Sequence, residues 1–506
     1  MTTTWGICGR RAGQVCRRLV LVAAAGSASV LASCSDMAPV APPAARAVLA
    51  ALPSAPRYVI ELPAAGSPSV ALALQIRAGG GRIVYSHAGA GIVIVAGLSA
   101  KSATALRLRN DVQAVVADLR RMRITDPAFK RMQVRTVKPS AAHPPSFTAR
   151  SFTPGSGVDP RTAQFFGDQW NMTVIQADTA WQITSQGAGE KVFILDTGVD
   201  TAHVDLVGRV NTSLSTSFAF ATDTDTVPLP FSHDVKAHGT FVSSQIATNS
   251  LGIAGVAPQA QLVMVRVLND SGEGSFSANL EGILYATDNG ANVINMSLGG
   301  YFDRTSADDM SFVDVFQRVV DYAFQRGILL VAAAGNSTED FNTATGPLGS
   351  FADSLNAPAG LHHILSVGAT GPIDEKNFDD IANYSNYGND GVAVFAPGGN
   401  SADTTAADDS ADIVDADLVI GACSSASTLC PGQENQYLIG DGTSFASPIV
   451  AGEAAVVQGQ STTVVGQALE TCIANTSTEV TGKRPDPNYG FGRVNVFTAV
   501  TSSSCK

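Results

Sequence analysis

The sequence has few charged residues, and basic residues are the scarcer kind. Charged residues make up only 15% of the 506 residues, and the net charge is −12. Phosphate binding needs a basic face, so this balance argues against a nucleic-acid partner. Hydrophobic residues make up 45% of the chain, which is typical of a globular protein with a sizeable core rather than a disordered one. The 48 glycines predict many tight turns.

Cysteine is absent between residues 35 and 422, and no cysteine spacing is typical of a zinc site. Three cysteines lie in the first 34 residues and four in the last 84. If the N-terminal segment is removed, an even number remains, which indicates an oxidising, extracytoplasmic compartment. These four allow three pairings, and short-range closure favours Cys423–Cys430 and Cys472–Cys505. Four free buried thiols are the alternative.

Residues 1–33 are predicted to be an export signal. Several arginines precede the apolar stretch 19–32, which is too short to span a bilayer comfortably. The sequence Leu31-Ala32-Ser33-Cys34 resembles a bacterial lipobox, in which Cys34 is lipidated and becomes the new N-terminus. Ordinary cleavage after a small residue is the alternative. A lipid on Cys34 would attach only the precursor to a membrane.

An Ala/Pro-rich linker over residues 34–57 leads into a predicted small α+β domain at 58–124. Its pattern gives the order strand, helix, two strands, helix and strand. Between Lys101 and Lys138 there are ten basic and three acidic residues. A solvated face is the default interpretation, but a basic segment would also be attracted to an otherwise acidic chain. Residues 137–165 are Pro/Ser/Gly-rich, and residues 125–166 are predicted to be an exposed linker that contains a processing site.

From residue 167 to residue 506, short apolar runs alternate with helical stretches. The runs KVFILDTG, QLVMVRVL, VINMSLGG, ILLVAAAGN and HILSVGAT are typical of strands buried on both faces. This alternation predicts an α/β domain with a mainly parallel sheet flanked by helices. Functional sites in such sheets lie where loops leave the carboxyl ends of the strands.

Three polar residues lie at strand ends or helix starts of this domain. Asp196 ends an apolar strand, His238 precedes a helical run, and Ser444 begins a helix whose first turn is expected to contain Pro448. Singly they are best interpreted as a turn residue, a core histidine and a helix cap. Together they supply the acid, base and nucleophile that amide hydrolysis needs. Their order along the chain is Asp, His, Ser, which differs from the order in α/β-hydrolases and from the order in chymotrypsin.

Seven segments, in their usual order, are similar to signature segments of the subtilisin-like serine proteases. They are DTGVD, HGT, VINMSLGG, AAAGN, SNYG, FAPGG and GTSFASP, and the resemblance runs from about Gln169 to Ala499. The domain at 58–124 also resembles the inhibitory prosegment of that family. The resemblance implies that Asp196, His238 and Ser444 form the catalytic triad and that Asn336 donates to the oxyanion. The substrate-binding residues that it implies are Ser297, Leu298 and Gly299 in one wall of the cleft and Ala334 and Gly335 in the pocket for the residue before the cut.

The chain departs from the family pattern at a few positions. Phe241 and Ser243-Ser244 follow HGT where the family usually has HGTHVAG, and Phe445 stands where Met is commonest. None of these changes removes a reacting atom. Ser244 adds volume where glycine allows close approach, which predicts different packing of that helix.

The resemblance implies a secreted serine endopeptidase that is made as an inhibited zymogen and cleaves its own prosegment. It implies a monomer that acts on proteins or peptides and needs no cofactor for the chemistry. Structural calcium is implied by the family, but no metal ligand can be assigned, and the acidic clusters near 221–225 and 407–417 are interpreted as solvated loops. A catalytically silent binding protein on the same fold is the alternative. A metalloprotease is disfavoured, because HExxH is absent and His362-His363 lies in an apolar run.

Overall fold

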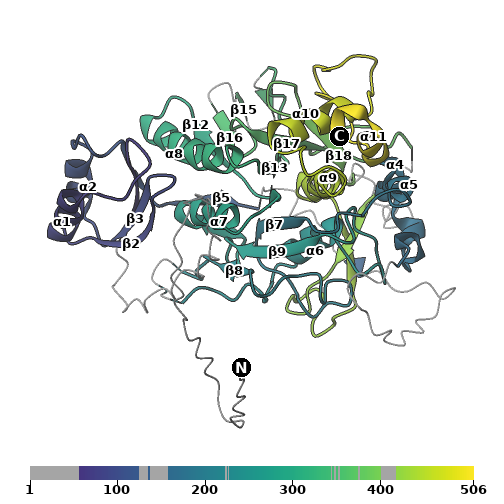
Figure 1. Ribbon diagram of the computed structural model, residues 1–506, viewed down its shortest axis with the longest axis horizontal. Coiled ribbons are helices and arrows are strands. Elements are labelled where there is room, and N and C mark those ends of the chain that lie inside the picture. The colour runs from purple at the N-terminus through teal and green to yellow at the C-terminus, as the bar shows by residue number, and fades with distance from the viewer. Residues whose placement is uncertain are drawn as a thin grey trace, which may run out of the picture. The chain divides into compact units, whose positions relative to one another are not determined.

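The computed structural model describes residues 56–124, 135–136 and 158–506, apart from 223–224, 226, 344, 347–348, 351–353, 374–375 and 401–416 (Figure 1). All of these residues belong to one compact unit, Leu49–Lys506. The predicted export segment, Cys34 and most of the processing linker lie outside the described residues. Most of the acidic cluster near 407–417 does so too.

The first described segment is a four-stranded antiparallel sheet with two helices. Its strands, in spatial order, are β2 (Arg82–His87), β3 (Ile92–Ala96), β1 (Arg57–Glu61) and β4 (Ala114–Ala117). The helices α1 (Val70–Ala78) and α2 (Ala100–Leu106) follow Ser69 and Ser99, whose hydroxyls accept backbone hydrogen bonds of 3.0 and 3.1 Å in the first turn. The elements follow one another in the order predicted from the sequence. Some of their apolar side chains form a small core of their own, while Val59, Ile92, Ile94 and Val116 belong to a larger core shared with the later chain.

The second segment is built on a seven-stranded sheet in which every neighbouring pair is parallel. In spatial order its strands are β18 (Val394–Pro397), β17 (Ile364–Thr370), β13 (Leu329–Ala333), β11 (Val293–Met296), β7 (Lys191–Asp196), β9 (Gln261–Arg266) and β8 (Thr216–Ser217). The predicted parallel sheet is therefore confirmed. Because all the strands run in one direction, the loops that follow them leave from the same edge.

Helices cover both faces of this sheet. Four of them are α6 (His238–Ile246), α7 (Phe276–Asp288), α8 (Ala307–Phe324) and α9 (Thr443–Gln458). Successive side chains of β7 point to opposite faces, as the pleat requires. Val192 and Ile194 pack into the core around α6 and α9, whereas Phe193 and Leu195 pack into the core around α7 and α8.

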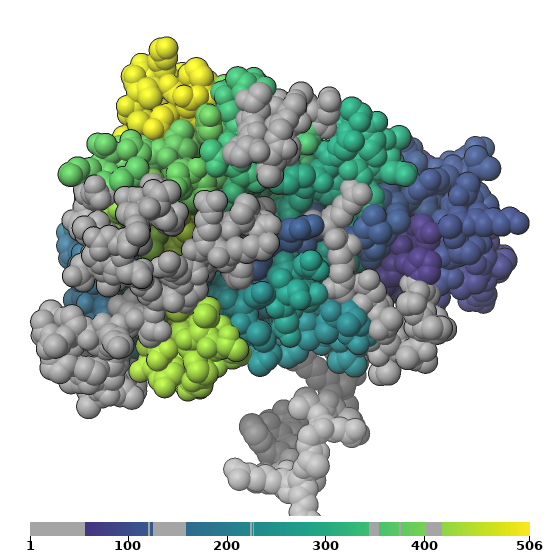
Figure 2. All heavy atoms as spheres, turned by 180° about the vertical axis from the view of Figure 1, so that it is seen from behind, coloured from purple at the N-terminus to yellow at the C-terminus, as the bar shows by residue number. Residues whose placement is uncertain are grey.

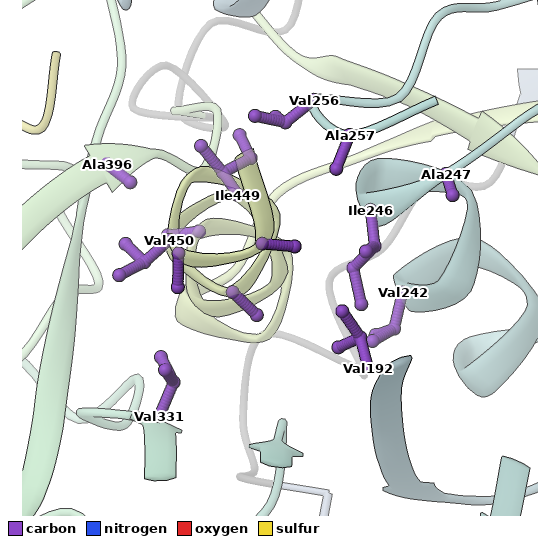
Figure 3. Close-up of a cluster of buried hydrophobic side chains, with 14 of the residues drawn as sticks. Val192, Val242, Ile246, Ala247, Val256, Ala257, Val331, Ala396, Ile449 and Val450 are labelled. Carbon is purple, nitrogen blue, oxygen red and sulfur yellow. The ribbon is translucent and has the colours of Figure 1, made fainter. Parts of the chain in front are cut away.

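All sixteen residues of α9 are buried, so this helix runs through the larger core. Figure 3 shows Ile449 and Val450 on α9, with Val331 of the sheet to one side and Val242 of α6 to another. A helix that is buried on every side has to be surrounded by other elements. The start of α9 is therefore held rigidly at the edge of the sheet.

The remaining elements complete the described chain. The strands are β5 (Arg120–Arg123), β6 (Arg135–Thr136), β10 (Glu273–Ser275), β12 (Gly300–Asp303), β14 (Thr345–Gly346), β15 (Gly349–Ser350), β16 (Ser354–Ala357), β19 (Val419–Ala422) and β20 (Tyr437–Gly440). The helices are α4 (Trp170–Val174), α5 (Ala177–Ala180), α10 (Gln467–Thr476) and α11 (Val496–Thr501), with 3-10 turns η1 (Pro160–Thr162), η2 (Phe166–Asp168) and η3 (Ser503–Cys505).

Two disulfide bonds lie in the last part of the chain. Cys423 pairs with Cys430 across a Cα–Cα distance of 6.3 Å, and Cys472 pairs with Cys505 across 5.3 Å. These are the pairings that short-range closure favours. The second one connects α10 to the C-terminal turn η3.

Candidate active site

Asp196, His238 and Ser444 all lie at the carboxyl edge of the central sheet. Asp196 is the last residue of β7, His238 the first of α6 and Ser444 the second of α9. Nδ1 of His238 lies 2.7 Å from Oδ1 of Asp196, and the two side chains are only 1% and 0% exposed. The imidazole ring is 6.0 Å, between centroids, from the ring of Phe445, the residue after Ser444. The structure thus joins Asp196 to His238 and brings the start of α9 beside the imidazole.

The Asp196 carboxylate is fixed by a chain of hydrogen bonds. Its Oδ1 accepts bonds from the backbone N–H of Thr197 at 2.7 Å and from the Thr197 hydroxyl at 3.1 Å. The Thr197 oxygen also lies 2.8 Å from Oδ1 of Asp234, whose Oδ2 accepts 2.8 and 2.7 Å bonds from the backbone and hydroxyl of Thr240. One hydroxyl hydrogen on Thr197 can serve only one carboxylate. Burial raises the pKa of Asp234, against the opposing effect of the hydrogen bonds from Thr240 and Thr197.

Sequence reasoning missed this hydrogen-bonded chain. Both threonines lie in the motifs that identified the site, since Thr197 follows Asp196 and Thr240 follows His238 by two positions. Asp234 is fully buried and lies four residues before His238. A carboxylate is costly to bury without hydrogen-bond donors. The threonines beside the two candidate residues could therefore have indicated that buried carboxylates lie nearby.

Asn336 and the N-terminus of α9 border the same small volume. The side-chain oxygen of Asn336 accepts hydrogen bonds from the backbone and hydroxyl of Thr443, at 2.9 and 2.8 Å. A methyl carbon placed on Gly442 would lie 3.7 Å from both Nδ2 of Asn336 and the backbone N of Ser444. Two N–H donors at a helix N-terminus are a suitable site for a developing oxyanion.

Ser297 contacts Ser444 in both directions. The Ser444 hydroxyl donates to the Ser297 carbonyl at 3.4 Å, and the Ser297 hydroxyl donates to the Ser444 carbonyl at 2.8 Å. Pro448 is the sixth residue of α9, so the prediction that it lies in the first turn of the helix is wrong. Proline has no N–H to donate to the carbonyl four residues earlier, which is that of Ser444. The Ser297 hydroxyl bonds to this carbonyl instead.

The other residues of the predicted wall continue from Ser297. Leu298 is fully buried in the core around α7 and α8. Gly299 exchanges backbone hydrogen bonds of 2.9 and 3.0 Å with Arg123 of β5. This wall therefore presents a backbone edge to which another segment of the chain is bonded.

Polar side chains lie behind the predicted pocket residues Ala334 and Gly335. The Ala334 carbonyl accepts hydrogen bonds from Nδ2 of Asn356 at 2.6 Å and Nδ2 of Asn386 at 2.8 Å. Gly335 has a φ of +105°, and a methyl carbon there would lie 2.6 Å from Asn386, so only glycine fits. Nδ2 of Asn386 also lies 3.3 Å from Glu339, whose pKa burial raises to about 7. The segment is thus held by a buried polar cluster.

The model of the subtilase family matches residues 187–492. This range is more than half of the chain and includes Asp196, His238, Asn336 and Ser444. The chain belongs to the subtilase family.

Curated relatives of this subtilase are proteases. It is 33% identical to the thermophilic serine proteinase of Bacillus sp. (strain AK1) over 347 residues, which cover 68% of this chain and 69% of that protein. It is 32% identical to thermitase of Thermoactinomyces vulgaris over 343 residues, which cover 67% of this chain and 99% of thermitase. These matches and the family confirm the prediction of a serine-type endopeptidase.

Solved structures show the same fold. The epidermin leader peptide processing serine protease of Staphylococcus aureus matches with a TM-score of 0.67 and 20% identity, covering 88% of this subtilase and 98% of that chain. Fervidolysin of Fervidobacterium pennivorans matches with a TM-score of 0.62 and 22% identity. The match covers 88% of this subtilase and 61% of the fervidolysin chain. At these identities the likeness shows the fold alone.

Two departures of this subtilase from the family pattern are in contact. Phe241 and Phe445 stack with ring centroids 3.9 Å apart. A methyl carbon on Gly421 would lie 2.4 Å from the Phe241 ring, so glycine makes room for it. The Ser244 hydroxyl donates to the Phe241 carbonyl at 2.7 Å and accepts from the backbone of Ala422 at 2.9 Å. The larger residues of α6 are thus accommodated by α9 and β19, and the catalytic atoms are retained.

The resemblance to the family predicts structural calcium, but the described residues offer no cluster of ligands for it. Within the described residues, no group of three His, Cys, Asp or Glu side chains is arranged to hold a metal ion. Calcium binding therefore stays a prediction from the family, and no residue is assigned to it. Subtilase chemistry itself needs no metal.

Replacing Asn336 with leucine is expected to lower kcat by about 10²–10³-fold and to change KM little. Leucine has a similar volume but cannot donate to the oxyanion, which forms only after attack. Steady-state kinetics on a peptide substrate would measure the loss, with thermal unfolding as the control for the lost contacts to Thr443. A fall in kcat of less than tenfold would contradict the role of Asn336.

The buried side chain of Glu453 is expected to make the stability of the protein depend on pH. Burial within α9 raises the pKa of Glu453 to about 8, against a smaller opposing effect of the Asn495 backbone. Because the folded-state pKa exceeds the unfolded value of 4.5, this contribution to stability is fully present below about pH 4.5 and is lost as the pH rises toward 8. We expect the melting temperature of Ser444→Ala protein to fall more steeply between pH 5 and 8 than that of Ser444→Ala/Glu453→Gln protein. Parallel curves would show that Glu453 does not titrate in this range.

Proposed function

We propose that this subtilase is an exported endopeptidase that acts through Asp196, His238 and Ser444 and cleaves its own prosegment. The observation that carries the proposal is the 2.7 Å bond between the buried side chains of Asp196 and His238, at the edge where α9 begins. Asp196 bonds to Nδ1, which fixes the tautomer and turns Nε2 into the nitrogen available for proton transfer.

The proposed reaction follows from this geometry. Oγ of Ser444 attacks the scissile carbonyl while Nε2 of His238 takes its proton, and buried Asp196 stabilises the imidazolium that results. The oxyanion accepts bonds from the Ser444 N–H and from Nδ2 of Asn336. His238 then protonates the leaving amine, and water hydrolyses the acyl-enzyme by the same steps in reverse order.

A serine-reactive phosphonate probe tests this proposal against a catalytically silent binding protein. We expect the folded wild type to gain one covalent adduct, found by mass spectrometry on the peptide that contains Ser444. Ser447→Ala is the matched control, because Ser447 lies in the same helix and its hydroxyl donates instead to Asn295 at 2.6 Å. Failure of folded, processed protein to react would favour the binding protein.

Export is supported by the disulfide bonds and the N-terminal signal pattern. Two disulfides near the C-terminus suit an oxidising compartment. Within the described part of the chain, no helix is both long and apolar enough to span a membrane. We propose a monomeric enzyme that acts on proteins or peptides and is inhibited by its prosegment until processing.

A lipid on Cys34 would lie on the prosegment side of the processing site. Self-cleavage would then separate the catalytic domain from the anchor unless the prosegment stayed bound. We expect the Cys34→Ala precursor to move from the membrane fraction to the soluble fraction when cells are fractionated. Unchanged membrane association of this variant would exclude the anchor.

A further inference from the structure

Asn295 is a polar residue in the middle of the central sheet. It belongs to β11, which is paired with β7 on one side and with β13 on the other. Its neighbours Ile294 and Met296 pack into the core around α7 and α8, whereas Val293 packs into the core around α6 and α9. Because side chains alternate along a strand, the Asn295 side chain lies on the α9 side. A buried amide is costly unless hydrogen bonds satisfy it, so its partners have to come from that side.

Hydrogen bonds connect the Asn295 amide to the start of α9. Its Oδ1 accepts a bond from the Ser447 hydroxyl at 2.6 Å, and its Nδ2 donates to Oγ of Ser297 at 3.1 Å. The Ser297 hydroxyl in turn donates to the Ser444 carbonyl at 2.8 Å. All four residues are buried, so the bonds are made away from bulk water.

The direction of each bond at Ser297 follows from the count of hydrogens. A carbonyl oxygen carries no hydrogen, so the Ser297 hydroxyl has to donate its single hydrogen to Ser444. The Ser297 oxygen can then only accept from Asn295, which requires that the amide present Nδ2 on this side. The Ser297 hydroxyl is therefore held in one orientation, with its hydrogen on the Ser444 carbonyl.

The Ser444 carbonyl lacks its regular helical donor. In an α-helix this carbonyl would accept from the N–H of residue 448, but Pro448 lies inside α9 and has no N–H. The proline ring also crowds the carbonyl four residues before it. The carbonyl belongs to the residue that carries the proposed nucleophile, so its direction helps to determine where Oγ of Ser444 lies. The Ser297 hydroxyl supplies a donor at the place where the helix has lost one.

The wall segment that contains Ser297 uses another position for backbone pairing. Gly299 exchanges hydrogen bonds of 2.9 and 3.0 Å with Arg123 of β5. Figure 2 shows a blue part of the earlier chain between teal and green parts of the later chain. The Ser297 side chain is fully buried and is turned toward α9. Its hydroxyl can therefore be removed without removing the backbone edge of the wall.

We propose that the Ser297 hydroxyl is a positioning group for Ser444, which acts through the Ser444 carbonyl and replaces the N–H that Pro448 lacks. The proposal rests on the proposed function, in which Oγ of Ser444 is the nucleophile. Ser297 makes and breaks no bond in the reaction. Without its hydroxyl, the first turn of α9 loses the bond that opposes the crowding by Pro448. A displacement of about 1 Å at a reacting atom can slow a reaction about 10²-fold.

The first experiment compares wild-type enzyme with Ser297→Ala enzyme after a trace of wild-type enzyme has removed the prosegment. The rate of labelling of Ser444 at saturating phosphonate is followed by intact mass, which separates the variant from the added wild type. We expect the labelling rate and kcat for a peptide substrate to fall at least tenfold, and KM to change less than threefold. A smaller fall in kcat, or a KM that changes threefold or more, overturns the proposal.

Ser447→Ala is the matched control for the loss of a buried hydroxyl. It removes the bond to Oδ1 of Asn295 but leaves the bonds from Nδ2 to Ser297 and from Ser297 to the Ser444 carbonyl. We expect kcat of this variant to fall less than threefold. A larger fall would mean that any hydroxyl lost beside α9 slows the reaction, and it would overturn the proposal.

The decisive experiment returns the missing N–H to the helix. In Pro448→Ala protein, residue 448 can donate to the Ser444 carbonyl, so the Ser297 hydroxyl is no longer needed there. We expect Ser297→Ala to lower kcat at least threefold less in the Pro448→Ala background than in the wild-type background. If Ser297 only fills space, the loss should not depend on residue 448. Losses that agree within threefold in the two backgrounds overturn the proposal.

Thermal unfolding identifies any variant that does not fold. If Ser297→Ala protein does not fold, Ser297→Cys takes its place in both backgrounds with the same expected results, because a thiol fills the site but is a weak donor.

These outcomes are distinguishable from failure of the proposed function. If wild-type protein reacts with the phosphonate probe and hydrolyses casein but the Ser297 variants are as fast, only the role of Ser297 is wrong. If wild-type protein is neither labelled nor active on any substrate, the proposed function is wrong and the role of Ser297 falls with it.

Discussion

Replacing Ser444 with alanine is expected to lower kcat for peptide hydrolysis by about 10⁶-fold, a magnitude typical of this replacement in serine proteases. It is also expected to leave the chain at full length. Alanine cannot form the acyl-enzyme, so only the oxyanion donors and substrate binding remain to accelerate the reaction. The precursor should therefore keep its prosegment, which gel electrophoresis of the purified protein would show.

Two controls separate the chemistry from inhibition by the prosegment. The Ser444→Ala precursor is treated with a trace of wild-type enzyme to remove the prosegment, and kcat is then measured on the repurified domain. Ser447→Ala protein should mature unaided and retain activity. If purified Ser444→Ala precursor lost its prosegment without added enzyme, self-processing would be wrong.

The places in the fold of the three proposed catalytic residues could be predicted from the sequence because these residues lie in short motifs with local structural meaning. Asp196 ends an apolar run, and Ser444 starts one, so a parallel sheet was enough to place both at its carboxyl edge. The strands of that sheet were readable because they are apolar on both faces. The prediction for Pro448 was wrong although the predicted helix start, Ser444, is only one residue from the observed one, because Pro448 lies beyond the first turn counted from either start.

Other features of the site depend on contacts between distant segments, which no local pattern encodes. The stacking of Phe241 on Phe445 joins two helices about 200 residues apart in the chain, and it needs Gly421 of a third element. The pairing of Arg123 with Gly299 likewise joins the proposed prosegment to the proposed wall of the substrate cleft. Both features become readable only when the fold has brought these segments together.

Replacing Asp196 with asparagine is expected to lower kcat by about 10⁴-fold at neutral pH, as in other triad proteases. Asparagine has nearly the same shape and can still accept the bonds from Thr197. The variant removes the negative charge that offsets the imidazolium of His238, and both side chains are almost fully buried, at 0% and 1% exposure. Water cannot replace that charge at such a site, so the whole effect should fall on kcat rather than on KM.

The matched control for this variant is Asp234→Asn, which changes the second carboxylate of the same hydrogen-bonded chain. Asp234 is linked to Asp196 and His238 only through the hydroxyl of Thr197, so its replacement should lower kcat by much less, about tenfold or under. Steady-state kinetics of both variants, each after prosegment removal by wild-type enzyme, would measure the difference. Equal losses would mean that the arrangement of Thr197 and the start of α6, rather than the charge on Asp196, limits the reaction. A large loss for Asp196→Asn alone would assign the effect to Asp196 itself, through its charge and its control of the His238 tautomer, rather than to the hydrogen-bonded chain behind it.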